Sequence, residues 1–152
     1  MTPDAVIAEA RTWLGTPYHS HGRVKGAGVD CATLLCEVFE AVGVVPHVDP
    51  GAYAPDWHLH RNEEQYVGWL QRYGREVETP NVGDVIVWKF GRCFSHGAIL
   101  CPDNMIIHSY LGQGVRWERR DAAVFEGRPC KYFTLWDDNG GIIRRCELEG
   151  GE

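Results

Sequence analysis

The sequence Gly28-Val29-Asp30-Cys31-Ala32-Thr33-Leu34-Leu35 has the pattern of a glycine-containing loop that leads directly into a helix. Apolar residues recur at helical spacing as far as Val42, and Gly43 is placed to end the helix. Asp30 suits the N-cap, because its side chain can accept hydrogen bonds from the free N–H groups of the first turn. Cys31 would then lie at the helix N-terminus, where the helix dipole favours a thiolate. The stretch predicts a reactive cysteine; the alternative is a buried cysteine that serves only as a small apolar residue.

Composition limits the class of protein. The chain has 152 residues, of which 44% are hydrophobic and 24% charged, and this fits one folded domain over residues 1–152. The net charge of -6 argues against general nucleic-acid binding, which needs a basic surface. No apolar run approaches the roughly 20 residues of a membrane span. The start, Met1-Thr2-Pro3-Asp4, has no basic region before a hydrophobic stretch, so we expect a chain made in the cytoplasm without a signal peptide.

The cysteines and histidines give little support to a metal site. Six cysteines occur at irregular spacing without a C-x-x-C pair, so a structural zinc site is poorly supported and reduced thiols are expected. His19 and His21 alternate in a loop, but two histidines without a third ligand are weak evidence for a metal. Cys36 follows Cys31 by five positions and points to a different helix face, so we expect no catalytic part for it.

The order of elements predicts an α+β fold. A first helix is expected from an N-cap at Thr2 to about Leu14, and a third from Asn62 to Tyr73, ended by Gly74. Prolines between residues 47 and 60 argue against regular structure there. In the second half of the chain, the apolar and β-branched residues take the pattern of strands. Strands are expected at 85–90, 96–100, 105–110, 115–119 and 131–136, with one short strand at 142–143 or none. Helices followed by hairpin-linked strands indicate an antiparallel sheet.

Two histidines complete a possible catalytic group. A cysteine nucleophile needs a base that takes its proton and a residue that orients this base. His96 and His108 lie on consecutive predicted strands joined by a turn at 102–104. An even register places them on one face of the sheet, nearly opposite each other. A histidine alone on a strand is more often a surface or core residue, but together with Cys31 the pair has the nucleophile–base–orienter pattern.

Four stretches in order resemble the NlpC family of papain-like cysteine endopeptidases, which cut bacterial cell-wall peptides. They are Trp13-Leu14-Gly15-Thr16-Pro17-Tyr18, Asp30-Cys31-Ala32-Thr33-Leu34, Val82-Gly83-Asp84-Val85-Ile86, and Ser95-His96-Gly97-Ala98-Ile99 followed by Met105-Ile106-Ile107-His108. The resemblance extends from about Thr2 to Trp136, and the ordered set carries it. It implies a papain-like α+β fold, in which N-terminal helices pack on a five-to-six-stranded antiparallel sheet.

The resemblance also implies roles for individual residues. These are Cys31 as the nucleophile, His96 as the general base, His108 as the orienting residue, Tyr18 with the Cys31 N–H as oxyanion donors, Asp30 as a holder of a substrate amine, and Ser95 as a further oxyanion or substrate contact. The family often has Asp-Cys-Ser-Gly at the nucleophile. The present chain has Ala32 and Thr33 instead of Ser-Gly, which leaves the nucleophile intact but bears on the substrate pocket.

The implied reaction is hydrolysis of an amide in the peptidoglycan stem peptide, typically between D-glutamate and a diamino acid, through a thioester acyl-enzyme and without a metal or organic cofactor. The long segment Val44–Gly74 and the missing secretion signal resemble the phage and prophage branch, which implies tail-tip partners and a place in the virion. The alternatives are an amidase or acyltransferase on another acyl substrate, a catalytically silent structural tail component, and a metal-binding protein that uses Cys31, His96 and His108.

Overall fold

The structure, a computed structural model, describes residues 2–48 and 65–136. Its helices are α1 (Pro3–Arg11), α2 (Cys31–Ala41) and α4 (Gln65–Tyr73), with a short 3-10 helix η1 (Ala123–Phe125). A small hairpin joins β1 (Arg23–Val24) and β2 (Gly28–Val29). The main sheet contains β3 (Arg75–Val77), β4 (Val85–Phe90), β5 (Cys93–Cys101), β6 (Met105–Tyr110), β7 (Gly114–Arg119) and β8 (Cys130–Thr134). None of the helices in the described ranges is long and apolar enough to cross a membrane.

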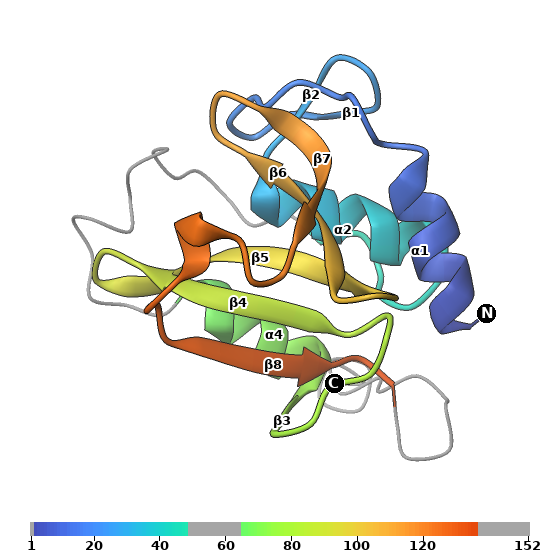
Figure 1. Ribbon diagram of the computed structural model, residues 1–152. Coiled ribbons are helices and arrows are strands. Elements are labelled where there is room, and N and C mark those ends of the chain that lie inside the picture. Colours follow the sequence, from blue (N-terminus) through green and yellow to red (C-terminus); the bar gives the residue numbers. More distant parts are fainter. Residues whose placement is uncertain (1, 49–64, 137–152) are drawn as a thin grey trace.

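The main sheet has the spatial order β3-β8-β4-β5-β6-β7, and every neighbouring pair is antiparallel. Strands β4 to β7 follow one another as a meander, and β8 returns to pair with β4 (Figure 1). The predicted α+β class with a five-to-six-stranded antiparallel sheet is confirmed, and the sheet has six strands.

The sheet separates between β5 and β6. Their ladder has only three pairs, from Cys101 opposite Met105 to Ile99 opposite Ile107. By contrast, β4 and β5 stay paired to the end of their hairpin, and so do β6 and β7. The β6–β7 hairpin therefore leads away from β4 and β5 in Figure 1, and the β5 edge beyond Ile99 is open to other parts of the chain.

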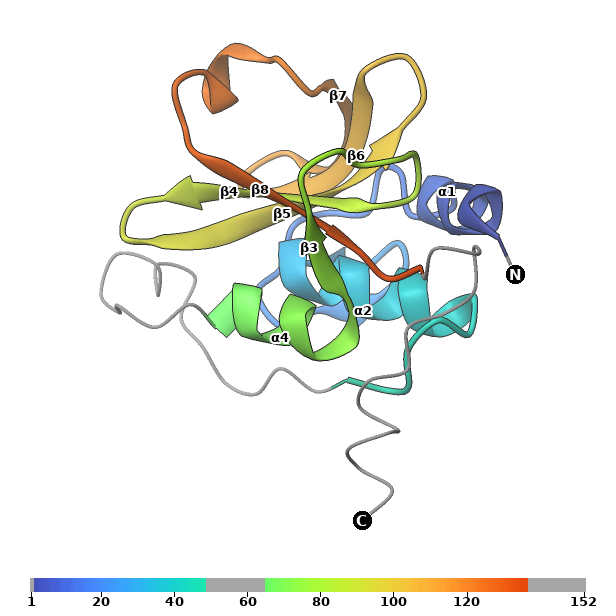
Figure 2. The same cartoon turned by 90° about the horizontal axis from the view of Figure 1, so that it is seen from below.

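Both faces of the sheet are covered. Helices α2 and α4 lie on one face, and the connection from β7 to β8, with η1, covers the other (Figure 2). Along β4, Val85 and Val87 pack into the core under the helices, while Ile86 and Trp88 join a second cluster with Phe125 of η1. Burial on both faces explains why β4 reads as an uninterrupted apolar run and not as an alternating one.

The predicted helix ends agree with the structure where the signal is a cap. The Thr2 side chain caps α1, Asp30 caps α2, and Gly43 follows the α2 C-cap with a positive φ of 80°. The prediction that the first helix reaches Leu14 was wrong, because the chain after Arg11 tightens into successive turns with i to i−3 hydrogen bonds. The predicted N-cap of α4 at Asn62 lies outside the described residues.

Short strands were harder to predict. Residues 23–28, expected as a loop, contain the β1–β2 hairpin, and β3 was not expected. Strand β5 begins at Cys93, three residues earlier than predicted, and β8 ends at Thr134, two residues earlier. Most of the irregular segment predicted at 47–60, and the optional strand at 142–143, lie outside the described residues.

Candidate functional site

The Asp30 carboxylate fixes the start of α2. Its Oδ1 accepts hydrogen bonds from the N–H groups of Ala32 (2.9 Å) and Thr33 (2.8 Å). Its Oδ2 accepts one from the His21 N–H at 2.8 Å, and the residue is only 1% exposed. Both oxygens are therefore already used by the backbone, so the structure places Asp30 as a helix cap and loop anchor beside Cys31.

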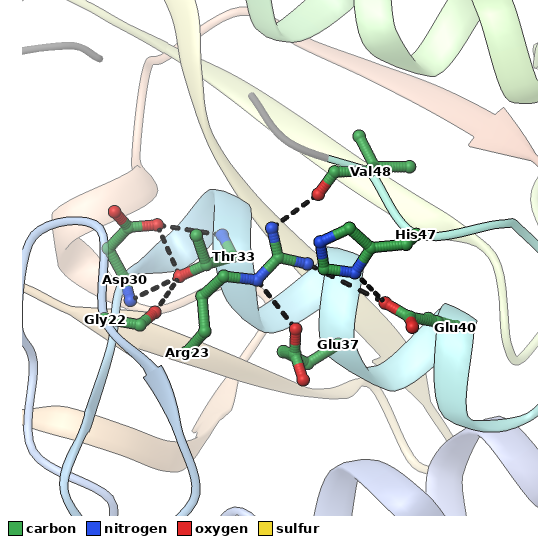
Figure 3. Close-up of polar contacts among 8 residues, drawn as sticks. All are labelled: Gly22, Arg23, Asp30, Thr33, Glu37, Glu40, His47 and Val48. Carbon is green, nitrogen blue, oxygen red and sulfur yellow. Dashed lines mark hydrogen bonds and ion pairs between the residues drawn. The ribbon is translucent and has the colours of Figure 1, made fainter. Parts of the chain in front are cut away.

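Thr33 and Arg23 attach the preceding loop and hairpin to the same helix (Figure 3). The Thr33 hydroxyl accepts from the Asp30 N–H at 3.0 Å and donates to the Gly22 carbonyl at 2.6 Å. Arg23 Nε forms an ion pair with Glu37 Oε2 at 2.7 Å. Because Arg23 is on β1 and Glu37 is on α2, this ion pair fixes the hairpin to the helix that begins at Cys31.

The Cys31 thiol lies at the open edge of β5. Its Sγ donates to the Ser95 carbonyl oxygen at 3.5 Å, and the Gly97 N–H faces the sulfur. These two groups flank His96 in the chain, so the thiol lies beside the β5 segment that carries this histidine. The separation of β5 from β6 leaves the backbone groups of this segment available to a residue from α2.

The predicted ease of ionisation of Cys31 was wrong. Burial, and to a smaller extent the neighbouring Asp30 carboxylate, raise the pKa of the Cys31 thiol to about 12. The N–H groups of Gly97, Cys31 and Ala32 act in the opposite direction but are outweighed. The thiol is therefore neutral at pH 7 in the absence of substrate, and its proton must be removed by a base.

His96 and His108 form a hydrogen-bonded pair. Nε2 of His96 lies 2.8 Å from Nδ1 of His108, and the residues are 7% and 2% exposed. The predicted common face is confirmed. The prediction that they lie nearly opposite each other was wrong, because the β5–β6 register, continued by one residue past Ile99 and Ile107, would set Ala98, and not His96, against His108. His108 is therefore a diagonal neighbour, reached where the ladder has ended.

Aromatic rings enclose the histidine pair. The rings of Phe90 and Tyr110 each lie 5.3 Å from the His96 ring, and the Phe125 ring lies 5.7 Å from the His108 ring. Burial lowers the pKa of His108 to about 4; the Glu118 carboxylate opposes this shift, and Arg116 adds to it. His108 is thus a neutral imidazole at pH 7. Its Nε2 is buried and has no hydrogen-bond partner among the described residues.

Tyr18 is held beside Cys31 by the segment in front of α2. The Val29 N–H donates to the Pro17 carbonyl at 3.0 Å, and the His19 N–H donates to the Val29 carbonyl at 3.2 Å. Burial, and then the neighbouring Cys31 and Asp30, raise the pKa of the Tyr18 phenol. The hydroxyl therefore stays protonated and can donate a hydrogen bond close to the thiol.

Gly114 lets residues 16–18, called here the Tyr18 segment, approach β7. Gly114 has a positive φ of 77°, and a Cβ at this position would lie 2.5 Å from the Thr16 carbonyl oxygen. The Val115 N–H donates to this same Thr16 oxygen at 2.9 Å. A glycine is required here, because any side chain would push the Tyr18 segment away from the sheet.

Other predicted candidates lie in different surroundings. The buried Ser95 donates its hydroxyl to the Phe90 carbonyl at 3.4 Å, so its carbonyl, and not its side chain, contacts Cys31. Cys36 lines an apolar cavity between α2 and α4. The five cysteines in the described ranges form no disulfide. In these ranges no three His, Cys, Asp or Glu side chains form a group that could hold a metal ion.

Two further contacts of Cys31 could not be identified from the sequence. Tyr66 donates its hydroxyl to the Cys31 carbonyl at 2.9 Å, and Gly97 presents its N–H to the sulfur. The helical pattern assigns Tyr66 only to the buried face of its helix. The contact joins residues 35 positions apart, so no local pattern carries it.

The comparisons with known proteins identify the family. Residues 15–133 match the NlpC/P60 family. No curated protein matches this chain. The NlpC/p60 domain of the peptidoglycan hydrolase SagA is a similar solved structure, with a TM-score of 0.59 and 20% identity over 86% of this chain and 97% of that one. The P60 domain of an antigen from M. avium subspecies paratuberculosis has a TM-score of 0.55 and 20% identity, covering 87% and 92% of the two chains.

A third solved structure shows that members of this fold differ in activity. RipD of Mycobacterium tuberculosis, described as a non-catalytic NlpC/p60 domain protein adapted to peptidoglycan binding, has a TM-score of 0.56 and 15% identity over 88% of this chain and 96% of that one. At sequence identities of 15–20%, these structures show only that the fold is shared. The family match covers well over half of the sequence and includes the stretches that bear Cys31, His96 and His108. The chain belongs to the NlpC/P60 family.

Proposed function

We propose that this protein is a cysteine endopeptidase that hydrolyses an amide bond in the peptidoglycan stem peptide, between D-glutamate and a diamino acid. One observation carries the proposal: the Cys31 thiol lies against the backbone on both sides of His96, and His96 is hydrogen-bonded to His108 at 2.8 Å. A thiol, a base and an orienting residue in this order are the parts needed for covalent acyl transfer.

In the proposed reaction Cys31 Sγ attacks the amide carbonyl carbon, and His96 takes the thiol proton. Nε2 of His96 is occupied by His108, so Nδ1 is the ring nitrogen that receives this proton. His96 then protonates the departing amine, which leaves a thioester on Cys31. Water then attacks the thioester carbonyl carbon while giving a proton to His96. The C–S bond breaks, the carboxylic acid leaves, and His96 returns the proton to Cys31 Sγ, which restores the thiol.

The oxyanion of each tetrahedral intermediate forms next to the N-terminus of α2. The Cys31 N–H and the Tyr18 hydroxyl are the donors we assign to it. The raised pKa of Tyr18 supports this assignment, because the phenol keeps its proton. Donors fixed before the reaction stabilise such charge more effectively than water does.

Neutral His108 suits the orienting role. The pKa of about 4 keeps this ring uncharged at pH 7, so one nitrogen accepts while the other carries hydrogen. When Nδ1 of His108 accepts from Nε2 of His96, Nδ1 of His96 is left unprotonated and able to act as a base. This is the tautomer of His96 that the proposed reaction requires.

A synthetic stem peptide with a D-glutamate to diamino acid bond tests the proposal. Wild-type protein and Cys36→Ala are expected to release a new amine, whereas Cys31→Ala is expected to release none. Cys36 is the matched control, because it lies on the same helix five residues after Cys31 and its side chain lines an apolar cavity. Release by Cys31→Ala would contradict the proposal. Activity on other acyl substrates alone would favour an amidase or acyltransferase.

Peptidoglycan binding without turnover is the second candidate. The raised pKa of Cys31 favours it, because a neutral thiol is a weak nucleophile until a base acts on it. Iodoacetamide separates the two functions. A catalytic Cys31 paired with His96 is expected to react faster than Cys31 in a His96→Ala variant, and equal rates would favour the binding function.

We further propose association with a phage or prophage tail, with tail-tip proteins as partners. The support is the long segment Val44–Gly74, of which residues 49–64 lie outside the described ranges. Immunogold labelling of phage particles from the strain that carries this gene tests the association. Label at the tail tip is expected, and particles without label would contradict it.

A further inference from the structure

Tyr66 joins the nucleophile helix to the strand that carries His96. It lies on α4, is 2% exposed, and donates its hydroxyl to the Cys31 carbonyl at 2.9 Å. We propose that Tyr66 is a positioning residue that sets the separation between Cys31 and His96. This inference rests on the proposed function, since it assigns a role in the same site.

The Tyr66 ring contacts β5 at Gly97. A Cβ added to Gly97 would lie 2.3 Å from the Tyr66 hydroxyl oxygen and 2.7 Å from Cζ. A side chain at position 97 is therefore excluded by the ring and not by backbone conformation. Gly97 directly follows His96, and its N–H faces the Cys31 sulfur. The Tyr66 side chain thus contacts the helix start at Cys31 through a hydrogen bond, and the strand by packing at Gly97, the residue after His96.

The hydroxyl of Tyr66 is not required for α2 to form. A carbonyl in the first helical turn accepts a bond from the N–H four residues later, and it has a second lone pair for another donor. The Tyr66 hydroxyl is such an additional donor. Its removal therefore leaves the helix intact but releases the link between Cys31 and the β5 side of the site. Tyr66→Phe should separate positioning from folding.

The test is the rate at which iodoacetamide alkylates Cys31, followed by mass analysis of the Cys31 peptide from about pH 5 to about pH 9. Tyr66→Phe is expected to slow this reaction about fivefold, as expected for loss of one hydrogen bond, and to move its pH profile to higher pH. Tyr73→Phe is the matched control, because Tyr73 lines the same cavity from the same helix. It should stay at the wild-type rate, and all three proteins should unfold at similar temperatures.

Gly97→Ala provides a second, independent measurement. It is expected to slow alkylation by at least about tenfold in the wild-type background, because its methyl group collides with the ring. In a Tyr66→Leu background, where the ring is absent, Gly97→Ala should slow alkylation much less. Such non-additive effects of the two substitutions are expected if the contact between Tyr66 and Gly97 sets the separation between Cys31 and His96.

Two results would overturn the inference: wild-type alkylation kinetics in Tyr66→Phe, or an equal cost of Gly97→Ala with and without the ring. If Gly97→Ala does not fold, the alkylation rates of Tyr66→Phe and Tyr73→Phe alone decide whether Tyr66 is a positioning residue. Alkylation needs no peptidoglycan. Slow alkylation of Tyr66→Phe together with a wild type that cuts no stem peptide would therefore contradict the proposed function and leave the positioning role standing.

Discussion

The Cys31 thiol lies at a helix N-terminus and is partly buried by protein, and these two features act on its pKa in opposite directions. Helix N-termini and N–H groups stabilise a thiolate, whereas burial removes the water that would solvate it. Here burial is the larger effect, and the Asp30 carboxylate adds to it. A nearby sequence motif indicates the helix terminus but not the degree of enclosure, which depends on distant segments. The position of Cys31 could therefore be predicted and its ionisation could not.

Burial of neutral His108 makes stability depend on pH. Its pKa falls from 6.5 to about 4 on folding, so between these values the unfolded chain binds a proton that the folded protein does not. Stability is fully present above pH 6.5 and decreases as the pH falls towards 4. The decrease between pH 7 and pH 5 should be about 2 kcal/mol. Urea unfolding at the two pH values measures it.

The matched variants for this prediction are His108→Gln and His19→Gln. His108→Gln should lose most of the decrease between the two pH values, whatever its stability at pH 7. His19→Gln, at an exposed position, should keep the wild-type dependence. A wild-type pH dependence in His108→Gln would show that other groups cause it.

Tyr18 provides a second prediction for single residues. Tyr18→Phe removes the hydroxyl assigned to the oxyanion and should lower kcat about 100-fold with little change in KM. Steady-state hydrolysis of the stem peptide checks this. Tyr132→Phe is the control, because the Tyr132 hydroxyl accepts from Arg120 and none of its described contacts involves Cys31. A change mainly in KM would assign Tyr18 to substrate binding.

At the level of elements, the start of α2 depends on a buried capping box. Thr33→Val keeps the side-chain shape but leaves the Asp30 N–H without its acceptor and the Gly22 carbonyl without its donor. One buried and one part-buried backbone group lose partners, so the free energy of unfolding should fall by about 2 kcal/mol. Thr12→Val, at an exposed residue after α1, should change it by less than about 0.5 kcal/mol. Urea denaturation of both variants gives the comparison, and equal effects would contradict the role of the box.

Some elements could be predicted from the sequence and others could not. The difference lies in how far apart in the chain the residues are that fix each element. The caps at Thr2 and Asp30 and the glycine after α2 act within a few residues, so local spacing reveals them. Strand β6 was predicted with its observed bounds, because β-branched residues lie between clear turn signals. The β1–β2 hairpin has two-residue strands, and its fixing by Arg23 and Glu37 is a contact across 14 positions. No local pattern predicts such a contact.

At the level of the whole molecule, the separation of β5 from β6 organises the site. It leaves β5 backbone groups near His96 free to meet the Cys31 thiol, and it lets His96 reach His108 diagonally. The sequence predicted that both histidines share a face, since their separation is even. It could not predict that the ladder ends at Ile99, because this depends on where α2, the Tyr18 segment and β7 pack.

Digestion of purified peptidoglycan, followed by mass analysis of the soluble fragments, shows whether Cys31 is the nucleophile that cleaves stem peptides. The measurement compares wild-type protein with Cys31→Ala in water enriched in oxygen-18. The account predicts stem-peptide fragments only with the wild type, each new carboxyl group carrying one heavy oxygen from hydrolysis of the thioester. Equal release by Cys31→Ala, or no release by a wild type whose Cys31 is intact and folded, would contradict it.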